Sequence, residues 1–574
     1  MNPAQLLSCF DRISDAPDAI PRLRRFVLDL AVRGKLVEQD PRDEPVTELL
    51  RRIQTEKSRR VKSGEIRAPR ESEASDEEDV PFQLPANWIW CRLSEVGAII
   101  GGGTPPSGDL DNFTDGGSGV AWLTPADLGK HSALYVSHGA RDLTPQGLRS
   151  SSATLMPKGS VLFTSRAPIG YTAIASNEIS TNQGFKSVVP YILDCNLYIA
   201  VYFRAFAKWI DGKASGTTFR EVSGKIVGNL PFPLPPLAEQ QRIVAKVDEL
   251  MALCDRLEAT QAERESKRDR LAASSLNRLN NGAAPDEFRD HARFCLNHLP
   301  RFTTRPEHIQ QLRQTILNLA VRGKLVPQDP NDEPGEAVLQ RIHSGASANM
   351  AGNGSTVGEE LGGLPFDIPN GWSVSRLGSI LLSTRSISYG VIKLGTEPQQ
   401  GGVFILRCSN VRFRRIDLNG IRKVTEQLSS EYGRTILEGG EVLINVRGTL
   451  GGCAVVPPEL KGYNIAREVA VIPVHTEIDP TFLLNVIASP YFQDRVDENL
   501  RGIAYEGLNL GLLRDFLVPI PAAAEQRRIV AKVDELLALC ERLEAQITTT
   551  QTESRRLLEA VLHEALAPAL NEAV

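Results

Sequence analysis

The chain of 574 residues lacks the features that mark membrane proteins and secreted, disulfide-rich proteins. It contains no run of about 18 apolar residues, so we expect no transmembrane helix. Residues 1–21 lack the basic-then-apolar order of a secretory signal. The eight cysteines are scattered and none forms a CxxC pair, which argues against a zinc ribbon. Scattered cysteines in a large chain are typical of reduced thiols, and we therefore expect a cytoplasmic protein.

The sequence also lacks the motifs of common catalytic centres. No glycine–lysine pair is followed by Ser or Thr, so the three glycines at 101–103 do not begin a P-loop. A GxGxxG turn between strand and helix is missing, as is the Asn/Asp-Pro-Pro-aromatic tetrapeptide of amino-methyltransferases. The histidines show no metal-ligand spacing, and His131 and His138 near Asp127 and Asp142 are more simply explained as loop residues. We expect no catalytic residue and no metal site in this chain.

The charge balance excludes less. The chain has 65 Lys and Arg against 70 Asp and Glu, so it lacks the basic excess that nucleic-acid-binding domains usually show. A local basic face can still exist within an acidic total. A hydrophobic fraction of 41% and a charged fraction of 24% are ordinary for a soluble globular protein, and the length suggests about four domains.

What the sequence does contain is a tandem duplication of a unit of about 290 residues. The stretch LRRFVLDLAVRGKLVEQDPRDEP at 23–45 recurs as LRQTILNLAVRGKLVPQDPNDEP at 312–334. The stretch AEQQRIVAKVDELMALCDRLEA at 238–259 recurs as AEQRRIVAKVDELLALCERLEA at 524–545. The first pair is 289 residues apart and the second 286, so one insertion or deletion separates them.

Two middle segments, residues 81–236 and 364–521, lie between these matched stretches and resemble each other only faintly. Both open on a proline with a tryptophan three residues later, carry a Gly-x-Val-Leu strand signal, and then place an arginine before a glycine turn. We expect strands at 161–164 and 442–445 and helices at 197–207 and 481–487, hence mixed α/β domains. Near-identical flanks around divergent middles are what a common scaffold carrying two different readers would produce.

Each matched stretch after residue 237 is predicted to form a long helix. Prolines precede it, and Glu239 and Glu525 in the first turn suit the helix dipole. A helix over 239–280 would be roughly 60 Å long at 1.5 Å per residue, and two such helices paired along their seams could act as a spacer. A simple dimerisation element remains the alternative. The predicted seam is Ile243, Val247, Leu250, Cys254 and Leu257, with Ile529, Val533, Leu536, Cys540 and Leu543.

The two seam cysteines are best explained as small apolar core residues rather than as a redox switch. Residues 71–79 form a short acidic run, and residues 344–363 are rich in Gly, Ser and Ala, so both are expected to be flexible or solvated connectors. The pattern over 281–305, which joins the two repeats, supports no assignment.

Candidate DNA-contacting residues lie beside glycine turns in both middle segments. Base edges are contacted by Arg, Lys, Asn, Gln, Ser and Thr, and phosphates by Arg, Lys and backbone amides. A single polar residue beside a loop is usually only solvated, so the repetition at matched positions carries the argument. The candidates are Thr104, Ser165, Arg166, Asn182, Gln183, Lys186, Thr217, Arg220, Arg385, Tyr389, Arg412, Arg414, Asn445, Arg447, Arg467, Arg501 and Tyr505.

The LAVRGKLVxQDPxDEP stretches at 30–45 and 319–334 resemble the specificity subunit of a type I restriction–modification system. So do the proline-rich step into Ala-Glu-Gln and the RIVAKVDEL helices at 242–250 and 528–536. The resemblance covers nearly the whole chain in the expected order. One departure is visible: Arg467-Glu468 stands where the first middle segment has Gly184-Phe185 or thereabouts, so loop contacts cannot be transferred between the halves.

The resemblance implies an α+β fold. Two α/β target-recognition domains would be separated by two long antiparallel coiled-coil helices in a pseudo-twofold internal duplication. The expected domains are an N-terminal conserved helical segment and linker (1–80), target-recognition domain 1 (81–236), a central long helix (237–283), a connector with the second copy of the N-terminal segment (284–363), target-recognition domain 2 (364–521) and a C-terminal long helix (522–574).

The resemblance also implies a non-catalytic role in recognition. Each target-recognition domain would read one half of a bipartite asymmetric site in double-stranded DNA, and the helices would set the spacer. The helices would also dock two modification (methyltransferase) subunits, and restriction (translocase) subunits would join them. No cofactor is expected in this chain; the modification subunit would bind S-adenosylmethionine, and the restriction subunit ATP and Mg.

Two other hypotheses remain open at this stage. A coiled-coil scaffold or interaction protein would show no DNA binding even with its partners present. A stand-alone nuclease or methyltransferase would turn over substrate as a purified chain. Neither explains near-identical flanks around divergent middles.

Overall fold

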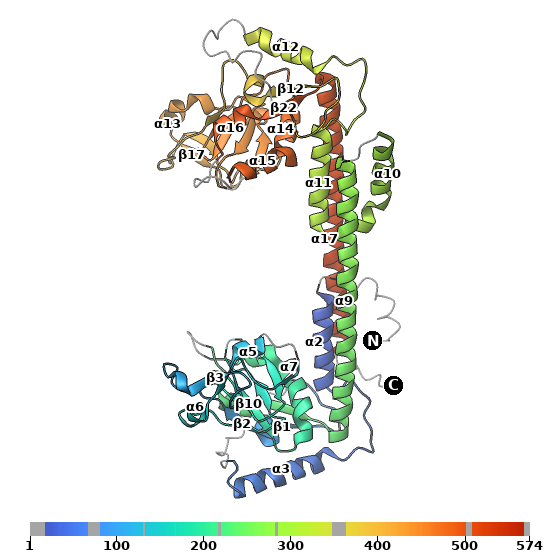
Figure 1. The fold of residues 1–574 in the computed structure, drawn as a ribbon, viewed down its shortest axis with the longest axis vertical. Coiled ribbons are helices and arrows are strands. Elements are labelled where there is room, and N and C mark those ends of the chain that lie inside the picture. The colour runs from blue at the N-terminus through green and yellow to red at the C-terminus, as the bar shows by residue number, and fades with distance from the viewer. Residues whose placement is uncertain are drawn as a thin grey trace. The chain divides into compact units, whose positions relative to one another are not determined.

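The computed structural model describes residues 16, 18–66, 81–129, 133–166, 168–215, 220–281, 285–346, 363–448, 451–500 and 508–566. The chain divides into two compact units, each of which contains one middle segment (Figure 1). Unit 1 comprises Met1–Glu263 with Gln551–Val574, and unit 2 comprises Arg264–Thr550. We call the middle segments middle domain 1 (residues 81–236) and middle domain 2 (residues 364–521). Both expected connectors, residues 71–79 and most of 344–363, lie outside the described residues.

Middle domain 1 is built on a five-stranded sheet with strand order β2-β10-β7-β8-β5. Because strand residues alternate between faces, Phe163 and Leu162 point to opposite sides. Phe163 stacks on Phe203 of α7 (Asn196–Gly212), with ring centroids 4.3 Å apart. Leu162 packs in a second apolar cluster with Phe185. The strands are β2 (Gly97–Gly101), β5 (Tyr135–Val136), β7 (Val161–Phe163), β8 (Thr172–Ala175) and β10 (Lys186–Pro190).

Shorter elements complete middle domain 1. Two further strand pairs are formed: β4 pairs with β9 in parallel, and β3 pairs with β6 in antiparallel orientation. The elements are α4 (Leu93–Val96), η2 (Leu110–Asn112), β3 (Phe113–Asp115), β4 (Trp122–Leu123), α5 (Pro125–Gly129), β6 (Arg141–Leu143), α6 (Pro145–Arg149), β9 (Ser180–Thr181), η3 (Leu193–Cys195) and α8 (Gly224–Gly228).

Middle domain 2 repeats this plan with different lengths. A four-stranded antiparallel sheet has the order β13-β21-β18-β19, and a three-stranded sheet has the order β17-β14-β20. Val442 and Ile444 pack in one core cluster with Phe482 of α14, whereas Leu443 packs in another cluster with Leu406 of β14. The main elements are β13 (Ser388–Tyr389), β14 (Val403–Leu406), β17 (Arg422–Val424), β18 (Val442–Asn445), β19 (Cys453–Val455), β20 (Asn464–Ile465), β21 (Val469–Ile472), α14 (Pro480–Ala488) and α15 (Pro490–Leu500).

The expected strands at 161–164 and 442–445 and the expected helices at 197–207 and 481–487 are therefore present, with slightly different ends. The remaining short elements of middle domain 2 include a β15–β16 hairpin. They are η4 (Leu377–Ile380), β15 (Val411–Arg412), β16 (Arg415–Ile416), α13 (Glu426–Glu431), η5 (Gly433–Thr435), η6 (Pro458–Leu460) and α16 (Leu510–Asp515).

A two-stranded antiparallel pair closes each middle domain where the chain enters and leaves it. In unit 1, β1 (Ile89–Arg92) pairs with β11 (Pro231–Leu234). In unit 2, β12 (Ser373–Arg376) pairs with β22 (Leu517–Ile520). Since the two ends of each domain meet directly before a long helix, the interior of the domain can differ without changing how it is attached.

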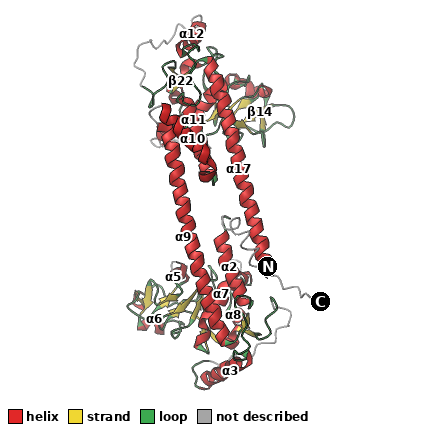
Figure 2. Cartoon of the chain, turned by 90° about the vertical axis from the view of Figure 1, so that its right-hand side faces the viewer, coloured by secondary structure: helices red, strands yellow, loops and turns green. Residues whose placement is uncertain are grey.

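The long helices are α9 (Leu237–Asn281) and α17 (Ala523–Leu566), and each contributes residues to both units (Figures 1 and 2). Their matched sequences explain why both begin directly after a proline-rich strand. Shorter helices accompany them: α2 (Ala19–Val32) and α3 (Val46–Lys62) in unit 1, and α10 (Pro285–Phe302), α11 (Pro306–Val321) and α12 (Gly335–Ala346) in unit 2.

The first half of each predicted seam is filled from within its own unit. Ile243 and Val247 are fully buried in a cluster shared with α2 and α7. Ile529, Val533 and Cys540 are fully buried in a cluster that includes α11 and α14. The seam is thus shared between the middle domain, a short helix and the long helix. The half-buried seam residues are Leu250, Leu257, Leu536 and Leu543.

The end of α9 packs within unit 2. Leu276 and Leu279 are buried with residues of α10, and Leu539 and Leu543 of α17 pack against the same cluster. The start of α9 and the end of α17 belong to unit 1, whereas the end of α9 and the start of α17 belong to unit 2, so the two helices run antiparallel, as expected. Much of the unassigned stretch 281–305 is α10, which covers this contact. Among the described helices, none combines the length and the apolar content that crossing a membrane requires.

Candidate nucleic-acid interface

The stretches that are duplicated in the sequence meet at the start of each long helix. Gly34 lies at φ 66°, and a Cβ built there would be 2.4 Å from Cγ of Pro85. Gly323 lies at φ 65°, with the corresponding distance to Cγ of Pro369 equal to 2.5 Å. Positive φ and the close proline both favour glycine over any other residue. The RGK turn of each repeat therefore packs closely against the start of its middle domain.

A buried carboxylate at the first turn of each long helix joins the same segments. The Glu239 carboxylate is fully buried and accepts a hydrogen bond from Gln39 Nε2 at 2.6 Å. The Glu525 carboxylate accepts hydrogen bonds from Gln328 Nε2 at 2.5 Å and from the Trp372 indole at 2.9 Å. Burial raises the pKa of both glutamates. The glutamates placed in the first turn by the sequence thus have a structural role in each repeat.

An arginine of each long helix pairs with the aspartate that follows the QDP motif by two residues. Arg242 forms two hydrogen bonds with the Asp43 carboxylate, at 3.0 and 2.6 Å. Arg528 contacts Asp332 in the same bidentate way. The Arg528 guanidinium lowers the pKa of the Asp332 carboxyl. We refer to the residues of these contacts, around Gly34 and Gly323, as the two scaffold junctions.

A second matched contact lies further along each helix. Arg24 of α2 pairs with Glu258 of α9 at 2.6 Å, and Arg313 of α11 pairs with Glu544 of α17 at 2.6 Å. The two scaffold junctions and these pairs show that like sequences have formed like structures in both repeats.

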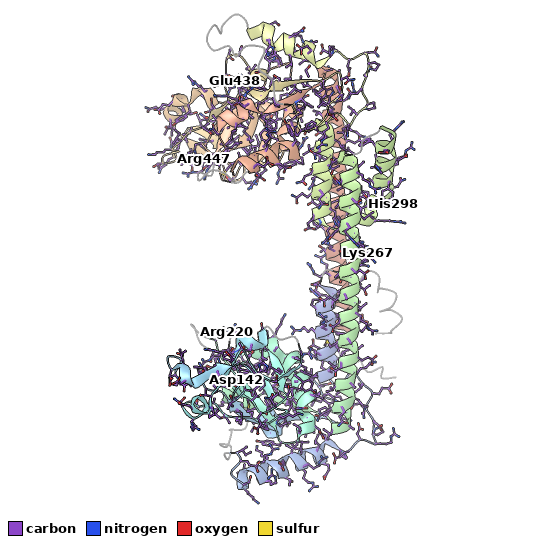
Figure 3. The ribbon with its side chains drawn as sticks, in the orientation of Figure 1. Asp142, Arg220, Lys267, His298, Glu438 and Arg447 are labelled. Atoms are coloured by element: carbon purple, nitrogen blue, oxygen red, sulfur yellow. The ribbon has the colours of Figure 1, made fainter. Side chains whose placement is uncertain are left out.

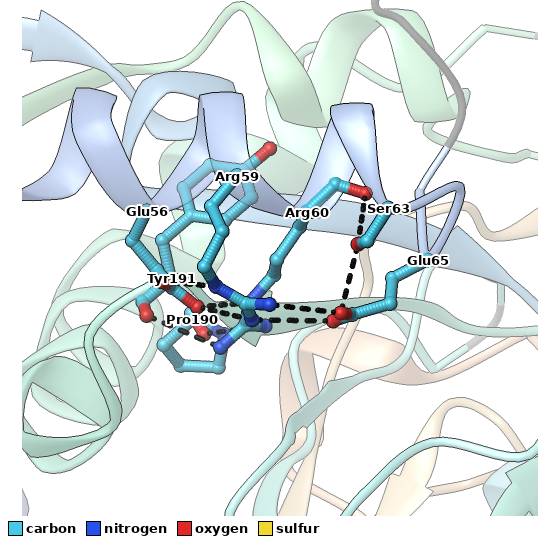
Figure 4. A network of polar contacts seen from close by, with 7 residues as sticks. All are labelled: Glu56, Arg59, Arg60, Ser63, Glu65, Pro190 and Tyr191. Atoms are coloured by element: carbon cyan, nitrogen blue, oxygen red, sulfur yellow. Dashed lines mark hydrogen bonds and ion pairs between the residues drawn. The ribbon is translucent and has the colours of Figure 1, made fainter.

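The helices that follow the junctions differ between the repeats. In α3, Arg59 and Arg60 both contact the Glu56 carboxylate, at 2.9 and 2.8 Å (Figure 4). Arg60 also donates to the carbonyl of Tyr191 at 3.2 Å, which ties α3 to middle domain 1. The two guanidinium groups lower the pKa of Glu56 to about 2. Because these arginines are paired, we do not count the basic face of α3 as a DNA surface.

The two middle domains present one equivalent sheet edge each. The Ser165 amide donates to the Gly184 carbonyl at 2.7 Å, and the Val446 amide donates to the Glu468 carbonyl at 2.8 Å. This register matches Gly184 to Glu468, so the expected correspondence of Arg467-Glu468 with Gly184-Phe185 is shifted by one residue. It follows that Gln183 corresponds to Arg467.

A close backbone crossing lies at the same place in both domains. A Cβ on Gly102 would be 1.9 Å from the Asn182 carbonyl oxygen, and a Cβ on Gly390 would be 1.8 Å from the Ile465 carbonyl oxygen. Only glycine fits such an approach. The crossing matches Gly102 to Gly390 and, two residues on, Thr104 to Ile392. We use the name edge 1 for the ends of β2 and β7 together with the start of β10. Edge 2 denotes the ends of β13 and β18 together with the start of β21.

Edge 1 brings together several of the predicted residues. Thr104 and Gln183 are exposed, and the Thr104 hydroxyl donates to Gln183 Oε1. Asn182 is half-buried, and its side-chain oxygen accepts a hydrogen bond from the Gly184 amide at 2.9 Å. Asn182 therefore holds the turn, whereas Gln183 and Thr104 face outward.

Glu221 neutralises two predicted cations of edge 1. Its carboxylate contacts Arg166 at 2.8 Å and Lys186 Nζ at 3.0 Å. Burial acts to raise the pKa of Glu221, but the hydrogen bonds from Lys186 and Arg166 outweigh it and leave the pKa lowered. Glu221 was not predicted from the sequence, because it lies 55 residues from Arg166. Arg166 and Lys186 are thus held in place with much of their charge offset.

The other predicted residues of middle domain 1 have different surroundings. Ser165 is fully buried, and its carbonyl accepts a hydrogen bond from Val222, so it belongs to the core. Arg220 is exposed at the end of the domain opposite α3, and it donates to the Asp211 carbonyl at 2.6 Å (Figure 3). Thr217 lies outside the described residues.

Edge 2 carries more cationic side chains. Arg467 is exposed, and so is Arg412 of β15, which lies beside the end of β18 because Asn445 Nδ2 donates to the Val411 carbonyl at 3.1 Å. Arg447 is half-exposed on the side of the domain opposite Glu438 (Figure 3). Within the described part of the chain, no ion-pair partner is found for these three guanidinium groups. Arg501 and Tyr505 lie outside the described residues.

Four predicted residues of middle domain 2 hold the fold instead. Arg385 pairs with the Glu441 carboxylate at 2.8 Å and is 12% exposed. The Tyr389 hydroxyl donates to a backbone carbonyl at 2.8 Å, and the Asn445 amide donates to two carbonyls at 3.1 Å. Arg414 lies at φ 56° and pairs with Asp534 of α17. We remove these four from the candidate interface, because each side chain already forms a hydrogen bond or ion pair within the fold.

The structure also adds residues that the sequence did not indicate. Arg407 follows β14 and contacts the Glu468 carboxylate at 3.4 Å. Ile392, at the position of Thr104, is 55% exposed. Only the matched register of the two edges reveals them, since neither belongs to a repeated motif.

The aspartates near His131 and His138 form hydrogen bonds with the backbone. Asp127 caps the start of α5 by accepting from the Thr124 amide at 2.7 Å, and Asp142 is buried and accepts from the Gly117 amide at 2.7 Å. His131 is not described. Across the described residues, no group of three or more His, Cys, Asp or Glu side chains could hold a metal ion.

Comparison with known proteins gives consistent matches. The family model of the type I restriction modification DNA specificity domain matches residues 85–265 and 369–550, one match per repeat. The specificity subunit of the Escherichia coli type I restriction enzyme EcoAI is 27% identical over 95% of this chain and 94% of that protein. The EcoEI specificity subunit of Escherichia coli is 25% identical over the same shares.

The chain also shows a weaker likeness to solved structures. A chain from a study of complex assembly and conformational transition in the type I R-M system has 20% identity and a TM-score of 0.46, covering 85% of this chain and 100% of that chain. The HsdS subunit of Thermoanaerobacter tengcongensis has 20% identity and a TM-score of 0.42, covering 85% of this chain and 98% of that chain.

Proposed function

This chain belongs to the family of type I restriction–modification DNA specificity domains, and we propose that it is the subunit that recognises the DNA site for such a system. Each middle domain is a target-recognition domain and reads one half of a bipartite, asymmetric site. The long helices α9 and α17 set the length of the unread spacer between the halves.

One observation carries this proposal. The scaffold junctions match in both repeats, whereas the outward-facing side chains at edges 1 and 2 differ at matched backbone positions. Gln183 stands where Arg467 stands, and Thr104 stands where Ile392 stands. Two copies of one fold with different polar edges suit the reading of two different base sequences. A protein that only served as a scaffold would gain nothing from this difference.

Electrostatics are compatible with DNA binding at edge 2. Arg412, Arg447 and Arg467 add positive charge to one edge of a chain whose total charge is −5. Arginine side chains can hold phosphates or read guanine edges. Edge 1 relies less on charge, because Glu221 offsets Arg166 and Lys186. We expect half-site 2 to contribute more of the salt-dependent part of the affinity.

We extend the proposal to the partner subunits and their cofactors. Two modification subunits dock on the long helices and scaffold junctions, and restriction subunits join them. The modification subunit binds S-adenosylmethionine, and the restriction subunit binds ATP and Mg. This chain contributes recognition and no catalytic residue, in keeping with the missing P-loop and methyltransferase motifs of its sequence.

The proposal is tested by sequencing methylated bases in cells that express the modification partner with and without this chain. Methyladenine in one bipartite motif should appear only when the chain is present. If the partner is expressed and bound to the chain but no motif changes, the recognition role is contradicted. DNA cleavage or methylation by the purified chain alone would contradict the non-catalytic role.

A further inference from the structure

Building on the proposed function, we propose that Gln183 and Arg467 are the same base-reading position in the two recognition domains, with Gln183 contacting an adenine in half-site 1 and Arg467 a guanine in half-site 2. Both residues follow the last short strand before the edge, β9 or β20, by two positions. Both are exposed. The two half-sites would then differ at this position because of one side chain.

The backbone around the two positions is the same. The Asn182 amide donates to the Leu123 carbonyl at 2.9 Å, and the Ala466 amide donates to the Leu406 carbonyl at 2.9 Å. One residue later the chain reaches Gln183 or Arg467. The close crossings at Gly102 and Gly390, described above, hold this segment against the neighbouring strand. A side chain at this position therefore leaves the sheet from a fixed point in each domain.

Gln183 is oriented for an adenine edge. The side-chain Oε1 of Gln183 accepts a hydrogen bond from the Thr104 hydroxyl, and the backbone carbonyl of Gln183 accepts one from Lys186 Nζ at 3.4 Å. The Thr104 contact fixes the plane of the carboxamide while Nε2 and one lone pair of Oε1 stay available. A carboxamide with one donor and one acceptor matches the N7 acceptor and N6 donor of adenine. Side-chain positions fixed by a neighbour discriminate better than free ones.

Arg467 offers the opposite chemistry from the same point. A guanidinium has only donors, so it matches the O6 and N7 acceptors of guanine and cannot accept from the amino group of adenine. Its neighbour Glu468 does not neutralise it, because the Glu468 carboxylate contacts Arg407 at 3.4 Å. The Arg467 amide donates to the Val391 carbonyl at 2.9 Å, which fixes the backbone.

Other candidates at the edges fit base reading less well. Arg166 and Lys186 share Glu221, and Asn182 is occupied by the Gly184 turn. Arg447 follows β18 by two residues and matches Arg166 in the register of the two edges, so this position carries the same side chain in both domains and cannot account for two different bases. The matched pair Thr104 and Ile392 is also exposed, but the apolar Ile392 side chain can form no hydrogen bond with a base edge. Gln183 and Arg467 are therefore the exposed, matched pair in which both side chains can hydrogen-bond to a base.

The test uses the complete complex with its modification subunits and duplexes carrying the motif that base-resolved methylation has identified. Every base pair of both half-sites is replaced in turn, and binding is measured for the parent, Gln183→Ala and Arg467→Ala. Arg467→Ala should lose roughly 10- to 100-fold in affinity and stop discriminating at one guanine of half-site 2. Gln183→Ala should do the same at one adenine of half-site 1.

Control variants separate base reading from general effects. Arg434→Ala removes an exposed arginine elsewhere in middle domain 2 and should leave the motif and affinity unchanged. Thr104→Val should weaken discrimination at the same adenine as Gln183→Ala, because it removes the hydroxyl that orients the carboxamide. Wild-type discrimination in both alanine variants would overturn the inference, as would uniform weakening over all positions. A parent complex that methylates no bipartite motif would instead contradict the proposed function.

Discussion

The scaffold junctions and the reading edges of the two repeats behave in opposite ways. At the junctions, Gly34 matches Gly323, and the pair Arg242–Asp43 matches Arg528–Asp332. At the edges only the backbone register matches, and the outward side chains differ. Attachment and recognition are therefore served by different residues of this chain. A domain closed by β1–β11 or β12–β22 can change its edge without disturbing the junction that carries it.

The largest effect is expected when the scaffold is changed while both edges stay intact. We expect a heptad inserted after Glu263 and another after Thr550 to keep the seam in phase. Each helix would lengthen by about 10 Å, close to three base pairs at 3.4 Å each. Methylation of the parent motif should be lost and replaced by the same half-sites at a new spacing, as read by methylome sequencing.

A matched control replaces seven residues after each point with other helix-forming residues of equal number. That variant should keep the parent spacing. If the lengthened variant also keeps it, the helices are not the ruler and the spacer role of the scaffold is wrong.

The next largest effect should come from the junction glycines. Gly34→Ala and Gly323→Ala each place a Cβ within 2.5 Å of a proline ring at positive φ. We expect each to lower the free energy of unfolding by about 2 kcal/mol or more, by strain and steric overlap. Chemical denaturation with a probe in each unit measures the change.

Glycines at positive φ in open space supply the controls. Gly64 and Gly395 have nothing within 4 Å of a built Cβ, so alanine there should cause only the smaller conformational loss. Equal effects at Gly34 and Gly64 would show that the proline contact does not matter and would weaken the junction model.

The edges can be compared through their arginines. Arg447→Ala should weaken binding to half-site 2 by roughly tenfold and reduce the salt dependence by about one charge. Arg166→Ala should weaken half-site 1 by less, because Glu221 already offsets its charge. Glu221→Gln should strengthen binding to half-site 1 by freeing Arg166 and Lys186. Titrations with duplexes mutated in one half-site at a time, repeated over a salt series, give these values.

Equal losses in the two arginine variants would contradict the charge difference between the edges. Wild-type affinity in both would remove Arg166 and Arg447 from the interface altogether.

The smallest effect concerns α3, which has no equally basic counterpart in α12. Arg59 and Arg60 lower the pKa of Glu56 to about 2, from an ordinary value of 4.5. The stabilisation by Glu56 is therefore present above about pH 4.5 and is lost as the pH falls toward 2. Glu56→Gln should cost below about 1 kcal/mol at pH 7, because the pair is near the surface.

Unfolding measured at several pH values between 6 and 3 tests this expectation. The difference between parent and Glu56→Gln should shrink as the pH falls. A difference that stays constant over this range would show that the carboxylate charge is not what ties Arg59 and Arg60 together.

The sequence predicted the architecture well because the duplication is direct. Two stretches with the same residues at a near-constant spacing must meet the same packing demands, so they form the same helices and the same junctions. The strands at 161–164 and 442–445 were predicted correctly because their glycine, β-branched and apolar pattern is local. The first half of the seam was less well predicted, since burial by α2 or α11 satisfies an apolar stripe as well as a second long helix does.

The candidate site was harder to predict. Arg166, Arg385 and Arg467 look alike in the sequence, yet Arg385 is held by Glu441, Arg166 by Glu221, and Arg467 is exposed. The partners of Arg166 and Arg385 lie about 55 residues away along the chain, and only folding brings them together.

The duplication, the long helices and the position of the two variable domains could therefore be predicted from the sequence, because they depend on residue patterns repeated along the chain. Which polar side chains remain available could be seen only in the folded structure. Burial and ion pairing depend on groups from distant segments, such as the contact of Arg414 with Asp534, and the register that matches Gln183 to Arg467 exists only between paired strands.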